Sequence, residues 1–307
     1  MSSPRIVVTG PLLDRHYDIF DFAGHVPRDP VQFPHRYEDR DDIEAIAFLA
    51  ATLAFGRVAA FEPHLSRMCE ALGEHPAATL KAAADEPVDP KALQAVDAAA
   101  AGQYRWLMPS DLRALLLGLG AALREWGTLE AGFVAGRPKG RKTKKVKEDG
   151  IWIPLGTFLQ SIKAHAAAAH VDAEGRSRAL AFLFPSVEGQ AACKRQHMFL
   201  RWMVRPATEG VDFGLWTEVE PSELVCPSDV HTARIGHALG LCARAEPSRK
   251  VADELTRSLR LFDPEDPTRF DFALAHLGIS GGCRAMYVPT VCESCALREA
   301  CQWWGRL

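Results

Sequence analysis

The chain has 307 residues, of which 48% are hydrophobic and 24% are charged, a balance typical of folded globular proteins. Its longest uncharged apolar run, residues 45–56, has 12 residues, fewer than the roughly 18 that a membrane-spanning helix needs. The opening residues MSSPRIVVTG lack the pattern of a secretory signal, so we expect a cytoplasmic protein. These features exclude a membrane protein, a secreted disulfide scaffold and a coiled coil.

In chain order, three segments have the periodicity of helices. Residues 43–55 are apolar on all sides after an Asp41-Asp42 start signal, which predicts a fully buried helix. A second helix is predicted around residues 112–123 and a third around 251–262, because each has a single apolar stripe. The stripes consist of Leu112, Leu115, Leu116, Leu119 and Leu123, and of Val251, Leu255, Leu259 and Phe262. Alternating strand patterns are scarce, so the predicted fold is all-α.

Residues 137–147 (RPKGRKTKKVK) carry seven cations and no acid, although the formal net charge of the whole chain is −3. Such a run is typical of a solvated loop. The run is also compatible with an arm that contacts nucleic-acid phosphate through Lys142, Lys144 and Lys145, since cations gain affinity by releasing counterions. Both interpretations remain open.

A second basic segment, residues 193–205 (CKRQHMFLRWMVR), contains four Lys or Arg residues and no acid. On a helix, one face would present Lys194, His197, Arg201 and Arg205, while Phe199, Trp202 and Met203 would turn toward the core. The basic face is either solvated or a phosphate-binding surface. Arg195 is a cation next to Lys194 and a further predicted DNA contact. Lys194 could act as an amine nucleophile if its pKa fell from about 10.4 toward 7–8.

The segment from Pro227 to Ile235 (PSDVHTARI) leads into a helix that is predicted to stop at Gly240. In one interpretation Ser228 or Asp229 simply caps this helix, and in the other Asp229 is a carboxylate held rigidly beside a cationic transition state. His231 and Arg234 follow on the same segment and are candidate DNA contacts.

Four cysteines are concentrated near the C-terminus with intervals of eight, two and five residues: Cys283, Cys292, Cys295 and Cys301. Four thiolates can surround a zinc ion or a [4Fe–4S] cluster. Because there is a single Cys-x2-Cys pair flanked by lone cysteines, the spacing favours the iron–sulfur cluster over zinc. We expect the cluster to be structural, since no dinucleotide-binding fingerprint accompanies it.

The order of these segments resembles the helix-hairpin-helix DNA glycosylases of the endonuclease III and MutY type. Residues 269–304 are similar to that family's ending, with the same x2 and x5 cysteine intervals, and the Asp229 segment is similar to its Val-Asp-x-His hallmark. The motifs RYEDRDD…AFLA, ACKR…FLRWMVR and FDP…DFAL look closer still to an uncharacterised bacterial family of unknown function. The resemblance implies that Asp229 is the catalytic carboxylate and that Lys194 falls at the Schiff-base lysine of bifunctional members.

The sequence departs from the glycosylase pattern at several points. The first cysteine interval is eight residues where the glycosylases usually have six, and the paired glycines of their hairpin are absent from Leu183–Gly189. The distance from Lys194 to Asp229 is nearly twice the usual one, so an insertion such as 206–223 must loop out. In the glycosylases a glutamine fills the space left by the flipped base. Its position falls near Ala54 in this sequence, and Phe55 or Arg57 could take its place.

The resemblance implies two lobes. An iron–sulfur lobe would comprise residues 31–58 and 226–307, and a helical lobe would comprise residues 59–225. The helical lobe would include the basic insert 137–147 and a hairpin-like segment, 183–205. Residues 1–30 would be an N-terminal extension. The predicted function is excision of a damaged or modified base from double-stranded DNA, as part of base excision repair in the bacterial cytosol. If Lys194 forms a Schiff base, the protein would also have abasic-site lyase activity. The alternatives are a non-catalytic iron–sulfur DNA-binding protein and a zinc-stabilised helical interaction module. The predicted DNA contacts are Arg57, Lys142, Lys144, Lys145, Arg195, Arg201, Arg205, His231 and Arg234.

Overall fold

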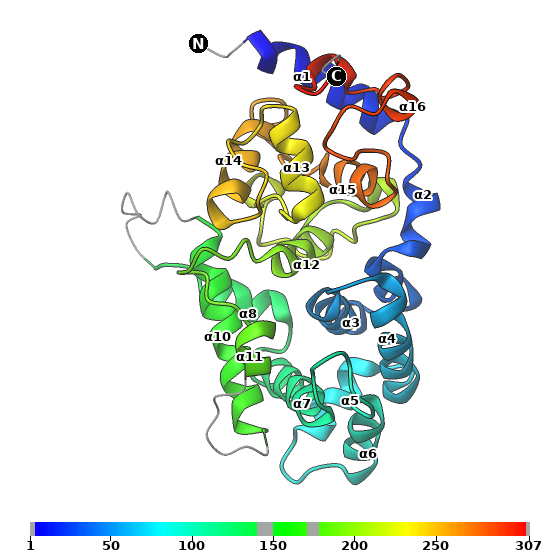
Figure 1. The fold of residues 1–307 in the computed structure, drawn as a ribbon. Helices are drawn as coiled ribbons and strands as arrows, with labels where there is room; N and C mark the ends of the chain where they lie inside the picture. The colour runs from blue at the N-terminus through cyan, green and yellow to red at the C-terminus, as the bar shows by residue number, and fades with distance from the viewer. Residues whose placement is uncertain (1–3, 140–149, 171–177, 305–307) are drawn as a thin grey trace. The chain divides into compact units, whose positions relative to one another are not determined.

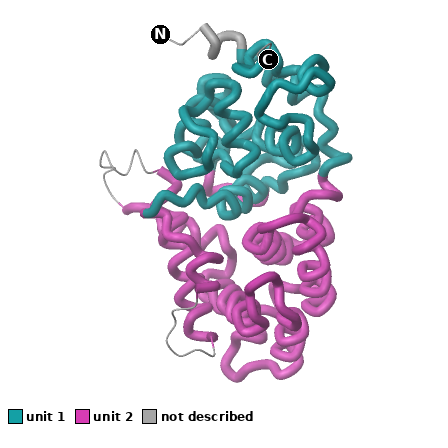
Figure 2. The backbone as a smooth tube through the Cα atoms, viewed as in Figure 1, with its two compact units in different colours: residues 1–25, 189–214, 220–307 teal, residues 26–188, 215–219 magenta. Residues whose placement is uncertain are grey.

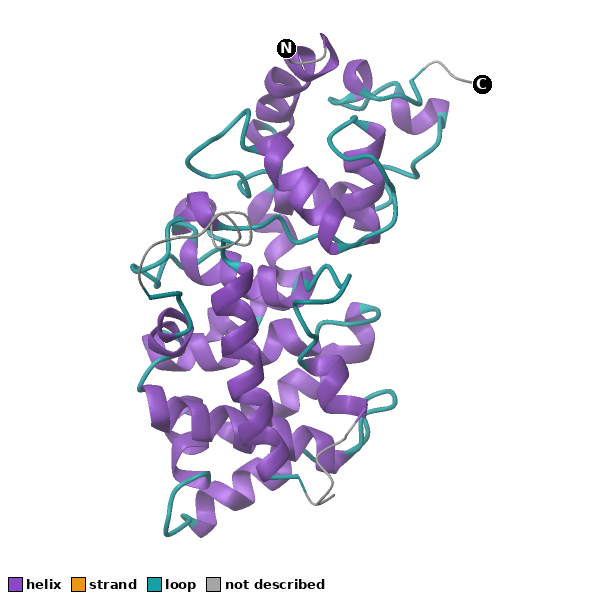
Figure 3. Cartoon of the chain, turned by 90° about the vertical axis from the view of Figure 1, so that its left-hand side faces the viewer, coloured by secondary structure: helices purple, strands orange, loops and turns teal. Residues whose placement is uncertain are grey.

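The computed structural model describes residues 4–139, 150–170 and 178–304. Within these ranges the regular elements are helices, joined by turns and one isolated bridge between Tyr104 and Leu107 (Figures 1 and 3). The predicted all-α fold is therefore confirmed. None of the described helices combines the length and the apolarity that crossing a bilayer requires.

The α-helices have the following bounds: α1 Pro4–Asp18, α2 Phe22–His25, α3 Arg40–Leu53, α4 Val58–Leu72, α5 Pro76–Ala83, α6 Pro90–Ala99, α7 Pro109–Trp126, α8 Leu129–Ala135, α10 Trp152–Ala168, α11 Arg178–Leu183, α12 Lys194–Val204, α13 Val230–Ala238, α14 Arg249–Leu259, α15 Asp271–Ile279 and α16 Pro289–Cys292. Short 3-10 turns lie at Val26–Arg28, Pro30–Gln32, Pro34–Arg36, Ala207–Glu209, Pro221–Glu223 and Arg298–Ala300.

The chain divides into two compact units (Figure 2). Unit 1 comprises residues 1–25, 189–214 and 220–307, and unit 2 comprises residues 26–188 and 215–219. This division differs from the predicted lobes, because residues 31–58 belong to unit 2 and the basic helix α12 belongs to unit 1. The physical reason is packing: α3 contacts α4 and α5 of unit 2, whereas the arginines of α12 are bound by acids of unit 1.

In unit 2, the predicted buried helix is α3, which is capped by Asp39 rather than by Asp41 or Asp42. Asp42 is buried and its Oδ1 accepts a hydrogen bond of 2.8 Å from the N–H of Ala77. Glu44 is also buried and accepts hydrogen bonds from Nε1 of Trp216 at 2.6 Å and from the N–H of Leu129 at 2.9 Å. Two buried acids of α3 thus bind segments that are distant in the sequence.

Burial raises the pKa of Glu44, and the hydrogen bonds from Leu129 and Trp216 act in the opposite direction. This carboxylate ties α3 to the start of α8 and to residues 215–219, the second segment of unit 2. Its role in the fold is structural, because both of its oxygens accept hydrogen bonds from within the unit.

The predicted leucine stripe of residues 112–123 lies on α7, and all five of its leucines are fully buried. Helix α7 packs against α10 and α5 (Figure 1). A methyl group at Gly118 would lie 2.6 Å from the backbone N of Ala166 on α10, and one at Gly120 would collide with the carbonyl oxygen of Leu80 on α5. Two glycines on one helix therefore allow close backbone contact with two neighbours.

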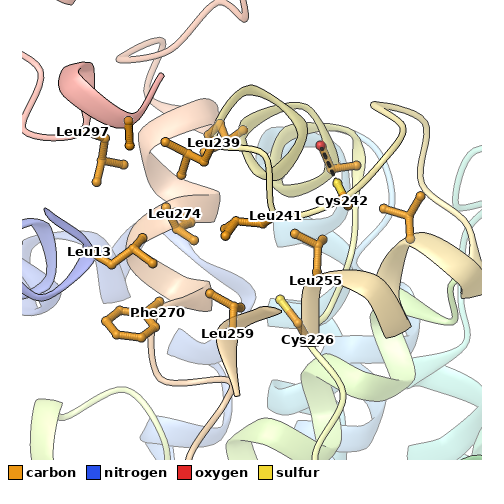
Figure 4. Packing of buried hydrophobic residues seen from close by; sticks show 14 residues of the cluster. Leu13, Cys226, Leu239, Leu241, Cys242, Leu255, Leu259, Phe270, Leu274 and Leu297 are labelled. Atoms are coloured by element: carbon orange, nitrogen blue, oxygen red, sulfur yellow. Dashed lines mark hydrogen bonds between the residues drawn. The ribbon is translucent and has the colours of Figure 1, made fainter. Parts of the chain in front are cut away.

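In unit 1, the core joins α1, α13, α14 and α15 with the segment between Cys295 and Cys301 (Figure 4). Leu13, Leu255, Leu259, Leu274 and Leu297 meet in this core. The predicted stripe of residues 251–262 is confirmed on α14, although its last member is partly buried and lies beyond the end of the helix. The cysteine segment is thus anchored to the same core that carries α13.

Candidate functional site

Helix α12 begins at Lys194, directly after Cys193, whose φ of 46° lies in the left-handed region. Cys193 is buried, and its pKa is raised to about 11, chiefly by burial. Phe199, Trp202 and Met203 are buried, as the helical periodicity predicts. Because these side chains fix one side of α12 in the core, Lys194 has a defined position at the start of the helix.

The other side of α12 is not the solvated basic face that the sequence allowed. His197, Arg201 and Arg205 are all at most 3% exposed. Burial, with the nearby charge of Arg249, lowers the pKa of His197 to about 3. This imidazole is therefore neutral at physiological pH, and α12, all of whose residues are described, presents no continuous cationic surface.

The two buried arginines are compensated by acids from distant segments. Nε of Arg201 lies 3.1 Å from Oδ1 of Asp212, and its Nη1 lies 2.6 Å from Oδ2 of Asp271. Nη1 of Arg205 lies 2.6 Å from Oδ2 of Asp212, and its Nε lies 2.7 Å from Oδ2 of Asp266. The predicted phosphate contacts of Arg201 and Arg205 are corrected accordingly: both guanidinium groups are engaged inside unit 1, because buried charges require partners.

Asp229 caps α13, as one of the two interpretations predicted. Its Oδ1 accepts hydrogen bonds from the N–H groups of His231 at 2.9 Å and Thr232 at 3.0 Å. Its other oxygen, Oδ2, lies 3.8 Å from Nζ of Lys194. The side chains of Lys194 and Asp229 are 29% and 24% exposed, so solvent reaches both. The structure therefore brings the two predicted catalytic residues together within unit 1.

A buried acid lies close to this pair. Asp271, the first residue of α15, has electrostatic contact with both Lys194 and Asp229 and accepts a hydrogen bond from Sγ of Cys226 at 3.6 Å. Burial raises the pKa of Asp271, and the positive charges of Arg201 and Lys194 oppose the rise. Sequence reasoning missed this residue, although a single acid in the apolar segment FDFALAHLGI was a signal for it.

This arrangement combines a primary amine with a carboxylate that is held by a helix N-terminus. Such a pair can supply a nucleophile, a proton acceptor and a negative charge beside a developing cation. Thr232 adds a hydroxyl, whose Oγ1 lies 3.3 Å from Oδ1 of Asp229. Chemically, a pair of this kind can support attack of an amine at an electrophilic carbon with proton transfer to the carboxylate.

The remaining predicted DNA contacts are dispersed. Arg195 is half-buried on α12, and Arg234 is exposed on α13. His231 is half-buried against α15, where a methyl group at Gly278 would lie 2.6 Å from its Cβ. Arg57 is exposed at the start of α4 in unit 2. The contacts predicted for the insert lie outside the described residues: Lys142, Lys144 and Lys145.

The four C-terminal cysteines are half-buried and influence one another electrostatically. Burial raises the pKa of Cys283 and Cys295, and the charges of the neighbouring thiolates raise it further. Sγ of Cys292 accepts a hydrogen bond of 3.4 Å from the N–H of Val288. Hydrogen bonds of this kind stabilise thiolate ligands of metal centres. Thiols are the donor type that a zinc ion or an iron–sulfur cluster would need. Among the described residues, however, no group of three or more His, Cys, Asp or Glu side chains is arranged to hold a metal ion.

Residues 29–280 match the model of a family described as "Protein of unknown function (DUF2400)". The matched region contains both Lys194 and Asp229, and it ends before Cys283. Comparisons with curated proteins and with solved structures found no match.

Proposed function

The chain belongs to the DUF2400 family, a family of unknown function, and from its candidate site we propose that it is a DNA glycosylase-like protein that excises a damaged or modified base. The observation that carries the proposal is the approach of Lys194 to Asp229, with 3.8 Å between Nζ and Oδ2. An amine and a carboxylate side by side suit a reaction in which positive charge develops on a sugar as its base departs. The resemblance to helix-hairpin-helix glycosylases assigns its catalytic roles to the same two residues.

The proposed reaction begins with a nucleotide that has been flipped out of the duplex. The amine of Lys194, once its proton has passed to solvent, attacks C1′ of the sugar, the N-glycosidic bond breaks, and the base leaves with the bonding electron pair and takes up a proton from water. Oδ2 of Asp229 accepts the proton that the attached nitrogen loses. The sugar ring then opens to a Schiff base as its ring oxygen gains a proton. In a glycosylase without lyase activity, Asp229 would instead orient water for attack at C1′.

The fixed position of the carboxylate supports this assignment. Because Oδ1 of Asp229 is held by two backbone N–H groups of α13, its negative charge needs little rearrangement during the reaction. At about 4 Å and an effective dielectric constant near 20, a carboxylate and a developing cation attract each other by about 4 kcal/mol. That energy corresponds to roughly a thousandfold in rate.

We assign the four cysteines to a [4Fe–4S] cluster with a structural role, and zinc is the alternative occupant. When bound, the metal centre would cross-link residues 283–301 and order the loop that they form. Cys283 and Cys295 already pack against the core of unit 1. The cysteine loop therefore belongs to the same unit as the proposed site.

The proposed partner is double-stranded DNA that contains a lesion, a modified base or an abasic site. Its phosphates would be bound by Lys142, Lys144 and Lys145 of the insert and by further basic side chains that are exposed or half-buried: Arg57, Arg195, His231 and Arg234. The proposed location is the bacterial cytosol, where the chromosome lies.

One observation favours a second candidate, a non-catalytic DNA-binding protein on the same scaffold. Asp229 already has a complete structural role as the cap of α13, which is worth about 1 kcal/mol. A cap and an ion pair could therefore account for the two residues without catalysis. The two candidates differ in one measurable property, which is covalent capture of DNA by Lys194.

That property is tested by borohydride trapping on duplex DNA that carries an abasic site, which requires no knowledge of the target base. The proposal expects a covalent adduct with the wild-type protein and none with Lys194→Arg, which keeps the positive charge beside Asp229 but lacks a primary amine. Lys250→Ala is the matched control, because this lysine is 70% exposed on the same unit. It should leave trapping unchanged.

Absence of an adduct with intact DNA binding would exclude the lyase. A panel of duplexes with damaged bases would then distinguish a single-function glycosylase, which releases a base without nicking the strand, from the non-catalytic alternative, which releases none. An adduct that persists in Lys194→Arg would remove Lys194 from the mechanism.

A further inference from the structure

Unit 2 carries an exposed aromatic cluster that the Lys194–Asp229 chemistry does not use. Trp106 is 40% exposed and Phe182 is 37% exposed, and their ring centroids lie 5.1 Å apart. Phe55 continues the cluster, with its centroid 4.8 Å from that of Phe182. The three rings come from three separate segments: the α3–α4 loop, the turn before α7, and α11. Large exposed aromatic side chains gathered in this way mark interaction surfaces.

The turn that carries Trp106 is held rigidly. Tyr104 and Leu107 exchange backbone hydrogen bonds of 3.1 and 2.9 Å, which places Arg105 and Trp106 at the tip. Arg105 has a φ of 54°, a strained value for a residue other than glycine. Below the tip, the buried Tyr104 donates its hydroxyl to the carbonyl of Phe55 at 2.5 Å. The exposed indole is therefore preorganised, and little conformational entropy remains to be lost on binding.

Positive charge is interleaved with these rings. The guanidinium carbon of Arg178 lies 5.7 Å from the ring centroid of Trp106, and that of Arg105 lies 5.6 Å from the centroid of Phe55. Both arginines are exposed, and among the described residues neither forms an ion pair with an acid. Arg57 is a third exposed cation, on the same loop as Phe55. The cluster is thus both aromatic and cationic.

We propose that Trp106 and Phe182 form a stacking surface for the unpaired bases of single-stranded DNA, with the adjacent phosphates bound by Arg105 and Arg178. Bases stack on exposed aromatic side chains irrespective of sequence, while arginines follow the backbone. Charge complementarity favours this occupant over an apolar protein partner, because such a partner would desolvate two arginines that have no acid partner among the described residues. This surface goes beyond the proposed base excision and does not depend on it.

Fluorescence anisotropy with a labelled oligothymidine tests the proposal in the full-length protein. Trp106→Ala and Phe182→Ala should each weaken binding about fivefold or more, the effect of losing one base–aromatic stack. Trp106→Phe keeps a ring at the tip of the turn and should restore most of the affinity. Met108→Ala is the matched control, since Met108 is 50% exposed next to the same turn but offers no ring.

The cationic part of the surface has its own control. Arg178→Gln should reduce the slope of log affinity against log salt by about 0.7, the value for one phosphate of a single strand. Arg113→Gln should leave the slope unchanged, because Nε of Arg113 already lies 2.6 Å from Oδ1 of Asp97. Both variants retain the aromatic rings, so a change in slope reports phosphate contact.

The proposal would be overturned if the wild-type protein did not bind single strands. It would also be overturned if Trp106→Ala, with an unchanged melting temperature, bound oligothymidine as tightly as the wild type, or if that substitution weakened binding of a fully paired duplex by the same factor. Preference for oligouridine over oligothymidine would replace DNA by RNA as the occupant and would also overturn it. Covalent trapping by Lys194 is measured in a separate experiment. A failure of the base-excision proposal would therefore not affect the single-strand binding result, and a failure of single-strand binding would not affect the base-excision proposal.

Discussion

Lys194 and Asp229 approach each other through one carboxylate oxygen: Nζ lies 3.8 Å from Oδ2, while Oδ1 is occupied by the N–H groups at the start of α13. The two oxygens of Asp229 thus have separate roles, one in the cap and one beside the amine. This separation allows the structural and the chemical contributions of the residue to be measured independently.

Asp229→Asn should abolish base excision while it preserves stability. Asparagine is as good a cap as aspartate, so the free energy of unfolding should change by less than about 0.5 kcal/mol, but the negative charge beside the developing cation is lost. Asp229→Ala should lose activity and also about 1 kcal/mol of stability. Denaturant unfolding and single-turnover base release measure the two effects.

Ser248→Ala is the control for these cap substitutions, because Oγ of Ser248 caps α14 through a 3.2 Å hydrogen bond from the N–H of Val251. It should cost a similar amount of stability and leave base release intact. If Asp229→Asn turned over at the wild-type rate, Asp229 would be a helix cap alone.

The buried ion pairs of α12 should be costly to break. Arg205→Met keeps much of the apolar stem but leaves Asp212 and Asp266 with fewer partners, so we expect a loss of about 3–5 kcal/mol in the free energy of unfolding. Arg113→Met removes a pair whose side chains are 31% and 52% exposed, and it should cost at most about 1 kcal/mol. Urea denaturation compares the two, and equal losses would contradict the structural role assigned to Arg205.

His197 should make unit 1 sensitive to acid. The pKa of this histidine is about 3 in the folded protein, below the ordinary value of 6.5. Between these values the unfolded chain binds a proton that the folded protein does not, so stability falls as the pH drops through that window. The slope for one proton approaches about 1.4 kcal/mol per pH unit.

The measurement is the free energy of unfolding at several pH values from 7 to 4. In His197→Gln, which cannot be protonated, the acid-side slope should be shallower by up to one proton, whatever the substitution costs at neutral pH. Parallel pH profiles for the two proteins would show that His197 does not contribute to acid sensitivity.

The cysteine segment should carry iron and sulfide after anaerobic purification. Cys295→Ala should lose the metal and lower the melting temperature, because the loop from Cys283 to Cys301 would then lose its cross-link. Cys69→Ala is the matched control, since Cys69 is a buried thiol of unit 2. Metal analysis and visible absorption are the readouts. Zinc without iron or sulfide would replace the [4Fe–4S] assignment.

Much of the local structure could be predicted from the sequence because it depends on short-range patterns. The apolar periodicity of residues 112–123 and 251–262 predicts α7 and α14, and both helices bury those stripes. Asp229 is predicted as a helix cap, since an acid before an apolar helical segment satisfies its first N–H groups. These features require only residues within about one or two turns of each other.

The sequence alone predicted the wrong environment for the basic side of α12. Residues 193–205 contain no acid, so a solvated or phosphate-binding face was a reasonable expectation. The acids that pair with Arg201 and Arg205 are Asp212, Asp266 and Asp271, and two of these are more than 60 residues away along the chain. Helical periodicity contains no information about such distant partners.

The helical class, the positions of α3, α7 and α14 and the residue types available for chemistry could be predicted from the sequence, because they follow from local periodicity and composition. Tertiary packing selects which of those residues meet. It brought Lys194 next to Asp229, buried two arginines that had looked exposed, and gathered Phe55, Trp106 and Phe182 from three segments. The physical reason is that long-range contacts are selected by the packing of whole helices around a shared core, which no single stretch of sequence specifies.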